Sequence, residues 1–470
     1  MRRRSSVQLV RISTTFTRYL AFATALIGAL TGCAATYQDA TEADLAAAER
    51  GLDPLPADGS SPGELDVDGS LEAYVATALR QSPSLRASFE RWRAAIARIP
   101  QARRLPEPTL TYGYFIRSVE TRVGPQRHRL GVSMSFPWPT KLTAGADAAS
   151  IAARSRQRSF ESKALDIGRQ VAEVYWQLWL VQRTREVQRD QLAVVRALSE
   201  ATRARVEVSS ADLADLNQVD LTVSRIEDML AGLDERERSL SAELLAAIGT
   251  TSGRATPISP RQVPSGGLPA ASHEDLVADA TSTPRVQAIE LMSEASLSKV
   301  RQARADRAPS FMVGFDWIET GQAMAPNTPG SGTDPLILMV GLRLPVWAYA
   351  YRGEEDEARS ESEAYRADAI DASNHAEAAL DQTLSAIRDA DRRIALYRDT
   401  LIPQAEAAYE SVVGAYQTGR STVAATLIAQ RELLELQLGL VRAQTEHAIA
   451  WARLEQVVGH EVAPRRNAND

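Results

Sequence analysis

Residues 109–117 have the sequence Thr-Leu-Thr-Tyr-Gly-Tyr-Phe-Ile-Arg, in which side chains alternate between apolar and small or polar. Residues 129–136, Arg-Leu-Gly-Val-Ser-Met-Ser-Phe, alternate in the same way. The segments 309–318 and 336–344 repeat this pattern in the second half of the chain. A period of two over about ten residues, with aromatic side chains on the apolar face, is typical of strands that cross a membrane. We therefore predict four strands, each with one face toward lipid.

Strands of soluble β-sandwiches alternate too, and that alternative is the commoner case. Two features favour the membrane interpretation: the strands are only four, and Gly and small polar residues fill their other face, as suits a wet lumen. A barrel needs at least about eight strands, and a sheet that spans a membrane cannot leave its edges open. Several copies of the chain are therefore expected to build one barrel. Three copies would supply twelve strands, but the number of copies is left open by this argument.

An internal repeat organises the rest of the chain. Three positions in the first half recur at a constant offset of 201 residues, and later positions recur at offsets of 208 and 210. The increase from 201 to 208 predicts a seven-residue insertion between Gly314 and Pro345. Each half is expected to contain a helix, two strands, a long helix and a returning helix. The matched pairs are Pro83 and Pro284, Pro108 and Pro309, Gly113 and Gly314, Pro137 and Pro345, Gly145 and Gly353, and Gly249 and Gly459.

The long segments have the pattern of coiled-coil helices. Residues 140–206 contain no proline, and a helix of that length would extend roughly 100 Å at 1.5 Å per residue. Apolar residues step by three and four within this segment and again in its returning partner, which predicts helices wound around each other as antiparallel hairpins. The stepped positions in the first half are Ile167, Val171, Val174, Leu178 and Val181, followed by Leu216, Val219, Val223, Ile226, Leu230 and Leu233. In the second half they are Leu384, Ile387, Ile394, Tyr397 and Leu401.

The N-terminus predicts export. Five arginines precede a short apolar stretch, residues 20–30, which is too short to cross a bilayer. The stretch ends in Leu30-Thr31-Gly32-Cys33, which resembles the lipobox of bacterial lipoproteins. That resemblance implies cleavage before Cys33 and a diacylglycerol thioether on its sulfur, with palmitate among the acyl chains. An ordinary signal peptide with a chance cysteine is the alternative. Cys33 is the only cysteine of the chain, so a disulfide framework is excluded.

Composition excludes several classes of function. The formal net charge is −7 over 470 residues, and it becomes more negative once the arginine-rich signal is removed. An acidic chain argues against nucleic acid as a partner. The five histidines show no ligand spacing, and no phosphate-binding loop or nucleophile motif is present, so we expect neither a metal site, nor a cofactor, nor an enzyme.

Taken together, the repeated motifs resemble those of the TolC-like outer-membrane efflux proteins over nearly all of the mature chain. The segments that carry the resemblance are residues 70–83, residues 416–422 and residues 454–459. The resemblance implies an outer membrane factor lipoprotein: a mixed α+β membrane protein, mostly helical, in which three copies form a twelve-stranded outer-membrane barrel on a periplasmic tunnel of helices. It also implies a passive conduit that works with a periplasmic adaptor and an inner-membrane pump of the resistance–nodulation–division type. Residues 136–142, Phe-Pro-Trp-Pro-Thr-Lys-Leu, favour the branch that exports metal cations over drug pumps.

Two turns join the hairpin helices and would form the periplasmic tips, where a partner docks. They comprise Val208, Ser209 and Ser210 in the first repeat, and Gly419, Arg420, Ser421 and Thr422 in the second. Family members often have glycine where this chain has Val208. Some also constrict the aperture with aspartates after the second tip, where this chain has Ala425 and Ile428.

Acidic side chains near these features have two interpretations. Asp212 and Asp215 could constrict the aperture from the first repeat, or they could simply favour the positive end of a helix. The run of acids at 354–357 could attract cations in the lumen, or it could compensate a helix dipole. Arg117, Arg129 and Arg343 on the polar strand faces could line the outer mouth, or they could be ordinary solvated residues of the lumen.

Six segments follow from these patterns. They are a signal peptide (1–32), a lipidated and extended leader (33–69), a first efflux repeat (70–255), a linker (256–272), a second repeat (273–460) and a polar tail (461–470). We predict an outer-membrane channel component of a tripartite system that exports small molecules or metal cations. The alternatives are the outer-membrane channel of type I protein secretion, and a non-channel periplasmic adaptor or structural coiled-coil lipoprotein. An adaptor would have one hairpin and no lipid-facing strands.

Overall fold

The structure is a computed structural model, and it describes residues 35–53, 67–209, 212–250 and 267–464. The predicted lipid site Cys33, most of the linker and the end of the tail lie outside the described residues. Within the described residues, no helix is both long enough and apolar enough to cross a membrane. The chain divides into two compact units, residues 1–50 and residues 51–470.

The first unit corrects one prediction. Helix α2 spans Ala35–Arg50, where we expected an extended leader. The Gly and Pro residues behind that expectation, which begin at Gly51 and Pro54, all follow this helix. The sequence of α2 is instead rich in Ala, which has the highest helix propensity.

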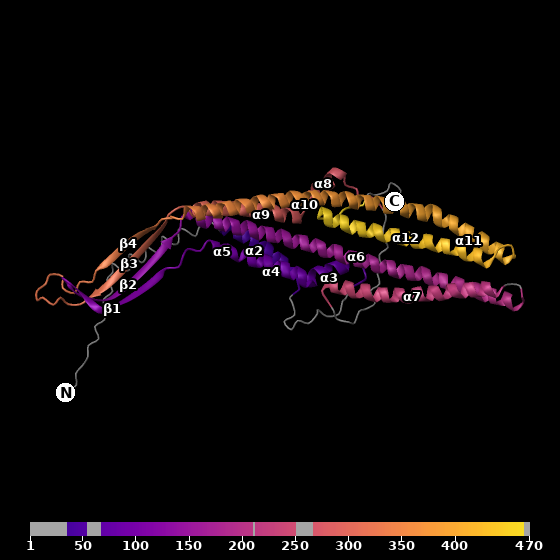
Figure 1. The fold of residues 1–470 in the computed structure, drawn as a ribbon, viewed down its shortest axis with the longest axis horizontal. Helices are drawn as coiled ribbons and strands as arrows, with labels where there is room; N and C mark the ends of the chain where they lie inside the picture. The colour runs from indigo at the N-terminus through magenta and orange to yellow at the C-terminus, as the bar shows by residue number, and fades with distance from the viewer. Residues whose placement is uncertain (1–34, 54–66, 210–211, 251–266, 465–470) are drawn as a thin grey trace, which may run out of the picture. The chain divides into compact units, whose positions relative to one another are not determined.

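In the second unit, the two halves have the same order of elements, as the repeat predicted (Figure 1). The expected long helix 140–206 is confirmed, with α6 covering Pro139–Glu207. The elements of the first half are α3 (Leu71–Gln81), α4 (Pro83–Ile96), α5 (Arg98–Ala102), β1 (Thr109–Thr121), β2 (Gly124–Phe136), α6 and α7 (Leu213–Ile248). Those of the second half are α8 (His273–Thr281), α9 (Pro284–Ala305), β3 (Ser310–Thr320), β4 (Leu336–Arg343), α10 (Ala348–Leu396), the π-helix η1 (Tyr397–Leu401), α11 (Ile402–Gln417) and α12 (Val423–Val458).

The four strands form one antiparallel sheet in the order β1-β2-β3-β4. Strands β1 and β2 extend beyond their predicted ends to a tight turn between Thr121 and Gly124, so the prediction placed their outer ends too early. Backbone pairing continues through residues 118–128, where the side chains no longer alternate in polarity. The connection between β3 and β4 is longer, which agrees with the predicted insertion.

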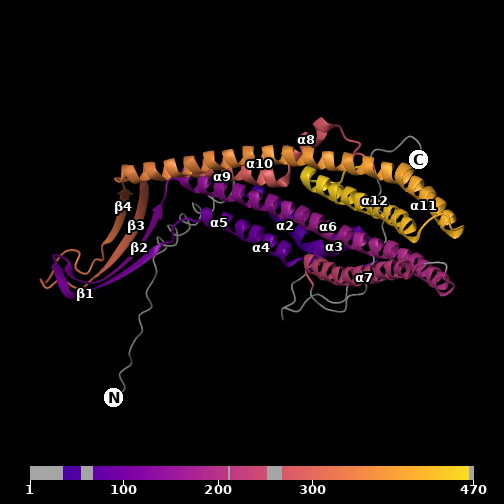
Figure 2. The same cartoon turned by 45° about the vertical axis from the view of Figure 1, so that its right-hand side comes forward.

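The helices lie side by side in the same order as the strands (Figure 2). Helix α6 contacts α4 and α7 on one side and α9 and α12 on the other, and α10 contacts α9 and α12. Most of the stepped apolar residues are buried between these helices, as the coiled-coil pattern predicted, with Val171, Leu178, Val219 and Ile387 among them, and the rest are half-buried.

Two glycines allow pairs of shorter helices to stack end to end. Gly249 ends α7 with a φ of 99°, and a Cβ added to it would lie 2.6 Å from Cδ of Pro83, the first residue of α4. Gly459 ends α12 with a φ of 86° and faces Pro284, the first residue of α9. The helix C-termini therefore meet the N-termini of helices about 170 residues away in sequence, and each pair acts as one long helix beside α6 or α10.

Candidate functional site

One face of the sheet is apolar across all four strands. The register places Leu110 beside Val132, Val132 beside Phe315, and Phe315 beside Leu338. These side chains are largely exposed within one chain: Leu110 retains 71% and Val340 73% of its accessible surface. A contiguous apolar surface of this extent marks a site that contacts lipid or another protein.

The opposite face is built around one polar group of side chains. Asp316 on β3 pairs with Arg129 on β2, and the Asp316 side chain is only 2% exposed. Gly131 makes room for this carboxylate, since an added Cβ would lie 2.1 Å from Asp316 Oδ1 and 2.5 Å from the hydroxyl of Thr111. The Thr111 hydroxyl donates a hydrogen bond to the carbonyl of Gly131 at 3.3 Å. The group therefore joins three strands on their polar face.

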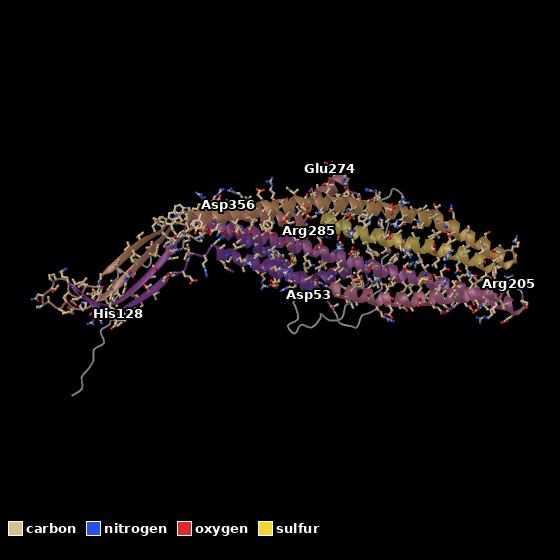
Figure 3. The ribbon with its side chains drawn as sticks, viewed as in Figure 1. Asp53, His128, Arg205, Glu274, Arg285 and Asp356 are labelled. Atoms are coloured by element: carbon tan, nitrogen blue, oxygen red, sulfur yellow. The ribbon has the colours of Figure 1, made fainter. Side chains whose placement is uncertain are left out.

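The arginines expected at the outer mouth have different surroundings. Arg129 is held in the ion pair with Asp316 rather than free in the lumen. Arg343 lies opposite Ser310, which places it on the polar face as predicted. Arg117 falls in the irregular stretch of β1 between Tyr114 and Val119, where the alternation is interrupted. His128, which Figure 3 labels, lies on the apolar face of the same region. Its Nδ1 and the Tyr112 hydroxyl are hydrogen-bonded at 2.7 Å.

Both outer strands have an unpaired edge. Within the described residues, β1 pairs only with β2, and β4 pairs only with β3. The backbone N–H and C=O groups along these edges have no strand partner in one chain. The hydrocarbon core of a membrane has no water that could hydrogen-bond with these groups in place of a strand. The sheet therefore requires further strands before it can cross a bilayer.

The two hairpin turns differ from the prediction in one position. The residue with left-handed backbone in the first turn is Ser209, with a φ of 59°, and its counterpart in the second turn is Gly419, with a φ of 74°. Val208, which we matched to the glycine of related chains, has a φ of −98° and needs no glycine. The offset of 210 residues that relates Gly249 to Gly459 also relates Ser209 to Gly419, so the repeat itself carried the correct match. Ser210 lies outside the described residues.

Replacing Ser209 by glycine is expected to stabilise the protein by about 0.5–1 kcal/mol, because the left-handed conformation strains a residue with a Cβ. The thermal midpoint of the purified protein should rise. Val208→Gly is the matched control, and it should lower the midpoint because glycine only adds freedom to the unfolded chain there. An equal response of both variants would refute the assignment of the strained position.

The residues that follow each turn begin the returning helices. Asp212 is the N-cap of α7, and its carboxylate accepts a hydrogen bond from the N–H of Ala214 at 3.1 Å. Thr422 caps α12 through the N–H of Ala425 at 3.2 Å, and Asp215 lies in the first turn of α7. Asp212 therefore stabilises the N-terminus of α7, which was one of its two interpretations. The other, that Asp212 and Asp215 constrict the aperture, stays a prediction. Arg420 and Ser421 belong to the second turn.

Contacts that the sequence analysis missed join the two hairpins near these turns. The guanidinium carbon of Arg205 lies 4.8 Å from the ring centroid of Tyr416, and the Thr202 hydroxyl lies 3.3 Å from the Tyr416 hydroxyl. Figure 3 shows Arg205 near the hairpin turns. Further along, the buried amide of Gln430 donates to Gln191 at 2.7 Å. The stepped positions of the second half end at Leu401, so the predicted seam did not reach Tyr416.

The acidic run at the start of α10 contains one buried member. Glu355 is 7% exposed and contacts Arg304 and Arg307 of α9 and Arg359 of its own helix. The hydrogen bond from Arg304 lowers the pKa of the Glu355 carboxyl below its usual value. Glu355 is therefore part of the α9–α10 interface, which corrects the suggestion that the run as a whole attracts cations in a lumen. Glu354, Asp356 and Glu357 are exposed.

A buried histidine fixes the end of the linker. His447 of α12 is fully buried, and one of its ring nitrogens lies 3.0 Å from the carbonyl of Gly267. The carboxylate of Asp391 accepts a hydrogen bond from the N–H of Gly267 at 3.1 Å. Burial lowers the pKa of His447 below its usual value. The linker thus returns to the coiled coil at a position held from both α10 and α12.

This histidine predicts a loss of stability in mild acid. The unfolded chain binds a proton at His447 near pH 6.5, whereas the folded chain binds it only at lower pH, so stability falls as the pH decreases below about 6.5. His447→Gln should reduce the fall in thermal midpoint between pH 7.5 and 5.5, and the exposed His375→Gln is the control. An unchanged pH dependence in His447→Gln would contradict this assignment.

Among the described residues, no three His, Cys, Asp or Glu side chains are grouped to hold a metal ion.

An exposed apolar sheet with open edges, continued by coiled-coil helices in the same order, defines a class of membrane channel proteins that assemble from several copies. Comparison with known families agrees: the family described as "Outer membrane efflux protein" matches residues 75–250 and 280–460. The chain belongs to the outer membrane efflux protein family. It is accordingly an outer-membrane efflux channel protein, and its family is one of channels, not of enzymes.

Solved structures of related channels share the fold. The outer membrane protein VceC of Vibrio cholerae is 20% identical, with 83% of this chain and 96% of that chain covered and a TM-score of 0.70. A membrane protein from Pseudomonas aeruginosa is 16% identical, with 87% and 98% covered and a TM-score of 0.69. The MtrE channel of Neisseria gonorrhoeae is 17% identical, with 83% and 89% covered and a TM-score of 0.67. No curated protein sequence matches the chain.

Proposed function

We propose that three copies of this chain form an outer-membrane channel that serves as the exit conduit of a tripartite export system. The observation that supports this most strongly is the sheet with two open edges and one apolar face. Pairing β4 of one copy with β1 of the next removes every open edge, and three copies give twelve strands, within the range of membrane barrels. The channel has no energy source of its own, so an inner-membrane pump would drive transport.

The channel and its stoichiometry can be tested together. The purified protein should sediment as a trimer and produce discrete conductance steps in a planar lipid bilayer. A monomer, or a trimer without conductance, would overturn the proposal. Either result would favour the alternative of a structural coiled-coil lipoprotein. An adaptor is disfavoured already, because the chain has two hairpins and four strands with an exposed apolar face.

The partners in this proposal meet the channel at its two hairpin turns. Gly419, Arg420 and Thr422 in one turn, with Val208 and Ser209 in the other, are exposed at the ends of the paired helices, and Ser421 is partly exposed. A periplasmic adaptor would contact these turns, and a pump of the resistance–nodulation–division type would supply energy. Cysteines introduced at Arg420 should cross-link to the adaptor, while cysteines at the exposed Ser360 of α10, distant in sequence, should not. Equal cross-linking at both would refute docking at the turns.

Substrate class remains part of the proposal. Metal cations or other small molecules are the preferred cargo, and secreted proteins of a type I system are the alternative. A strain that lacks this protein should become sensitive to metal salts or to drugs if the cargo is a metal cation or another small molecule. Loss of a secreted protein without any change in sensitivity would establish the second.

Lipidation at Cys33 completes the proposal. The acyl chains would assist sorting and assembly, because the strands themselves supply a membrane anchor. Cys33→Ser, exported through a signal peptide without a lipobox, should assemble slowly and yet give conducting trimers. A variant that never reaches the outer membrane would show that the lipid is essential.

A further inference from the structure

A pocket lies between the first turns of α6 and the last turns of α9, where the sheet continues into the helices. Its volume is about 450 Å³, and its lining includes Trp138, which precedes α6, Thr140, Thr143 and Asp147 of α6, and Arg301 and Arg304 of α9. This is within the range of pockets that hold small ligands. Both helices have neighbours within the same chain on either side: α6 contacts α5 and α9, and α9 contacts α6 and α10. The pocket therefore does not lie at an edge that another copy would cover.

One wall of the pocket continues into the apolar face of the sheet. The ring centroid of Trp138 lies 6.3 Å from that of Phe311, and the two side chains are 40% and 45% exposed. Phe311 belongs to the same face as Phe315, which we expect to contact acyl chains. Tryptophan is enriched where hydrocarbon meets the headgroups of a bilayer. The pocket thus opens at the level expected for phospholipid headgroups of the periplasmic leaflet.

The pocket carries cationic donors that the protein uses only in part. Nε of Arg304 donates to Glu355 at 2.9 Å, and its two terminal nitrogens donate no hydrogen bond within the described residues. Arg301 donates to Ser298 at 2.8 Å, and its nearest carboxylate, Asp147, is 3.8 Å away, beyond hydrogen-bond distance. Arginine binds phosphate with paired N–H groups, and the Thr140 hydroxyl adds a neutral donor; the Thr143 hydroxyl already donates to the carbonyl of Thr140 at 3.3 Å.

The charged side chains that line the pocket are two cations, Arg301 and Arg304, and one carboxylate, Asp147. Arg304 is paired with Glu355, which is shared with Arg307 and Arg359. The Asp147 side chain is 52% exposed and is the one carboxylate that lines the pocket. A ligand with one phosphate and one nearby ammonium group complements this arrangement.

We infer that this pocket binds the headgroup of an aminophospholipid such as phosphatidylethanolamine, an inference that rests on the proposed insertion of the strands into the outer membrane. Arg301 and Arg304 hold the phosphate, with the Thr140 hydroxyl as a further donor. Asp147 accepts the primary ammonium group. The acyl chains leave the pocket past Trp138 and lie on Phe311. The bound lipid fixes the depth of the channel in the bilayer at the junction of sheet and helices.

Native mass spectrometry of the purified full-length protein, titrated with lipids of equal acyl length, tests this. Phosphatidylethanolamine should bind about tenfold more tightly than phosphatidylcholine, whose quaternary ammonium donates no hydrogen bond. Arg301→Gln with Arg304→Gln should weaken binding of both lipids about tenfold. Asp147→Asn should remove the preference for phosphatidylethanolamine and leave binding of phosphatidylcholine unchanged. Arg183→Gln with Arg238→Gln removes the same charge from exposed positions on α6 and α7, and it should change nothing.

Three results would overturn the inference. They are equal affinity of the wild type for both lipids, unchanged binding in the Arg301 and Arg304 variant, and an affinity for soluble phosphoethanolamine equal to that for phosphatidylethanolamine, since the acyl chains would then contribute nothing. Arg301→Gln alone leaves Glu355 with all three of its arginines and gives a smaller loss of affinity without disturbing that network. Conductance of the same preparations separates this inference from the proposed function. Conducting trimers that bind lipid without selectivity would refute the lipid-binding pocket and leave the proposed channel function unaffected.

Discussion

Leu338→Arg is expected to keep the protein out of the outer membrane. Leu338 lies in β4 on the apolar face, opposite Phe315, and 60% of its surface is exposed in one chain. An arginine facing lipid near the bilayer midplane costs about 2–4 kcal/mol. In the proposed trimer, three copies would carry this cost three times in one assembly. The amount of protein in the outer-membrane fraction, and the number of conducting channels per cell, should both fall by at least tenfold.

Met339→Arg is the matched control, because Met339 is the next residue of the same strand and points to the opposite face. That face also carries Arg129, Asp316 and Arg343. An arginine there would face water, so insertion should continue and only the conductance should change. If both variants insert equally, the assignment of the two faces is wrong. If Met339→Arg alone fails, the faces are reversed.

The sequence predicted these faces because side chains in a strand alternate with a fixed period of two. Leu110, Val132, Phe315 and Leu338 are assigned to one face by local sequence alone, and the observed register brings them together. The long helix 140–206 was predicted equally well, since the absence of proline and the heptad steps are also local properties. The internal repeat also predicted the order of helices and strands, because the two halves of the chain show the same sequence of patterns.

Features that depend on contacts between distant segments were not predictable. The burial of Glu355 follows from the packing of α9 on α10, and nothing in the run 354–357 distinguishes this residue from its neighbours. The space that Gly131 leaves for Asp316 depends on the register of β2 against β3. Helix α2 was missed for a different reason, since the composition of residues 37–69 was averaged over a helical part and a part rich in Gly and Pro.

The hairpin turns show how the repeat could have corrected a prediction based on resemblance. The resemblance compared Val208 with a glycine of related chains, but Val208 has a φ of −98° and needs no glycine. The offset of 210 residues within this chain leads from Gly419 to Ser209, which has the left-handed backbone. The two turns of this chain meet the same geometric requirement, so the internal repeat aligns their residues correctly.

The same symmetry makes the joints between stacked helices a sensitive site. Gly249 and Gly459 both end a long helix in the left-handed conformation, and each faces a proline that begins another helix. Their surroundings differ in one respect. A Cβ on Gly249 would lie 2.6 Å from Pro83 Cδ and 3.0 Å from the carbonyl oxygen of Gln81, whereas the nearest atom to a Cβ on Gly459 is Pro284 Cδ at 3.5 Å.

Gly249→Ala is therefore expected to destabilise each chain by about 2–4 kcal/mol, of which the left-handed alanine accounts for roughly 1–2 and the contact with Pro83 for the rest. Gly459→Ala has the backbone strain without the clash and should cost only about 1 kcal/mol. Thermal midpoints of the two purified variants measure the difference. Trypsin cleavage at Arg80 and Arg86 beside the joint should accelerate in Gly249→Ala alone. Equal destabilisation would mean that α4 and α7 do not meet closely end to end, and that the stacked pair does not behave as one continuous helix beside α6.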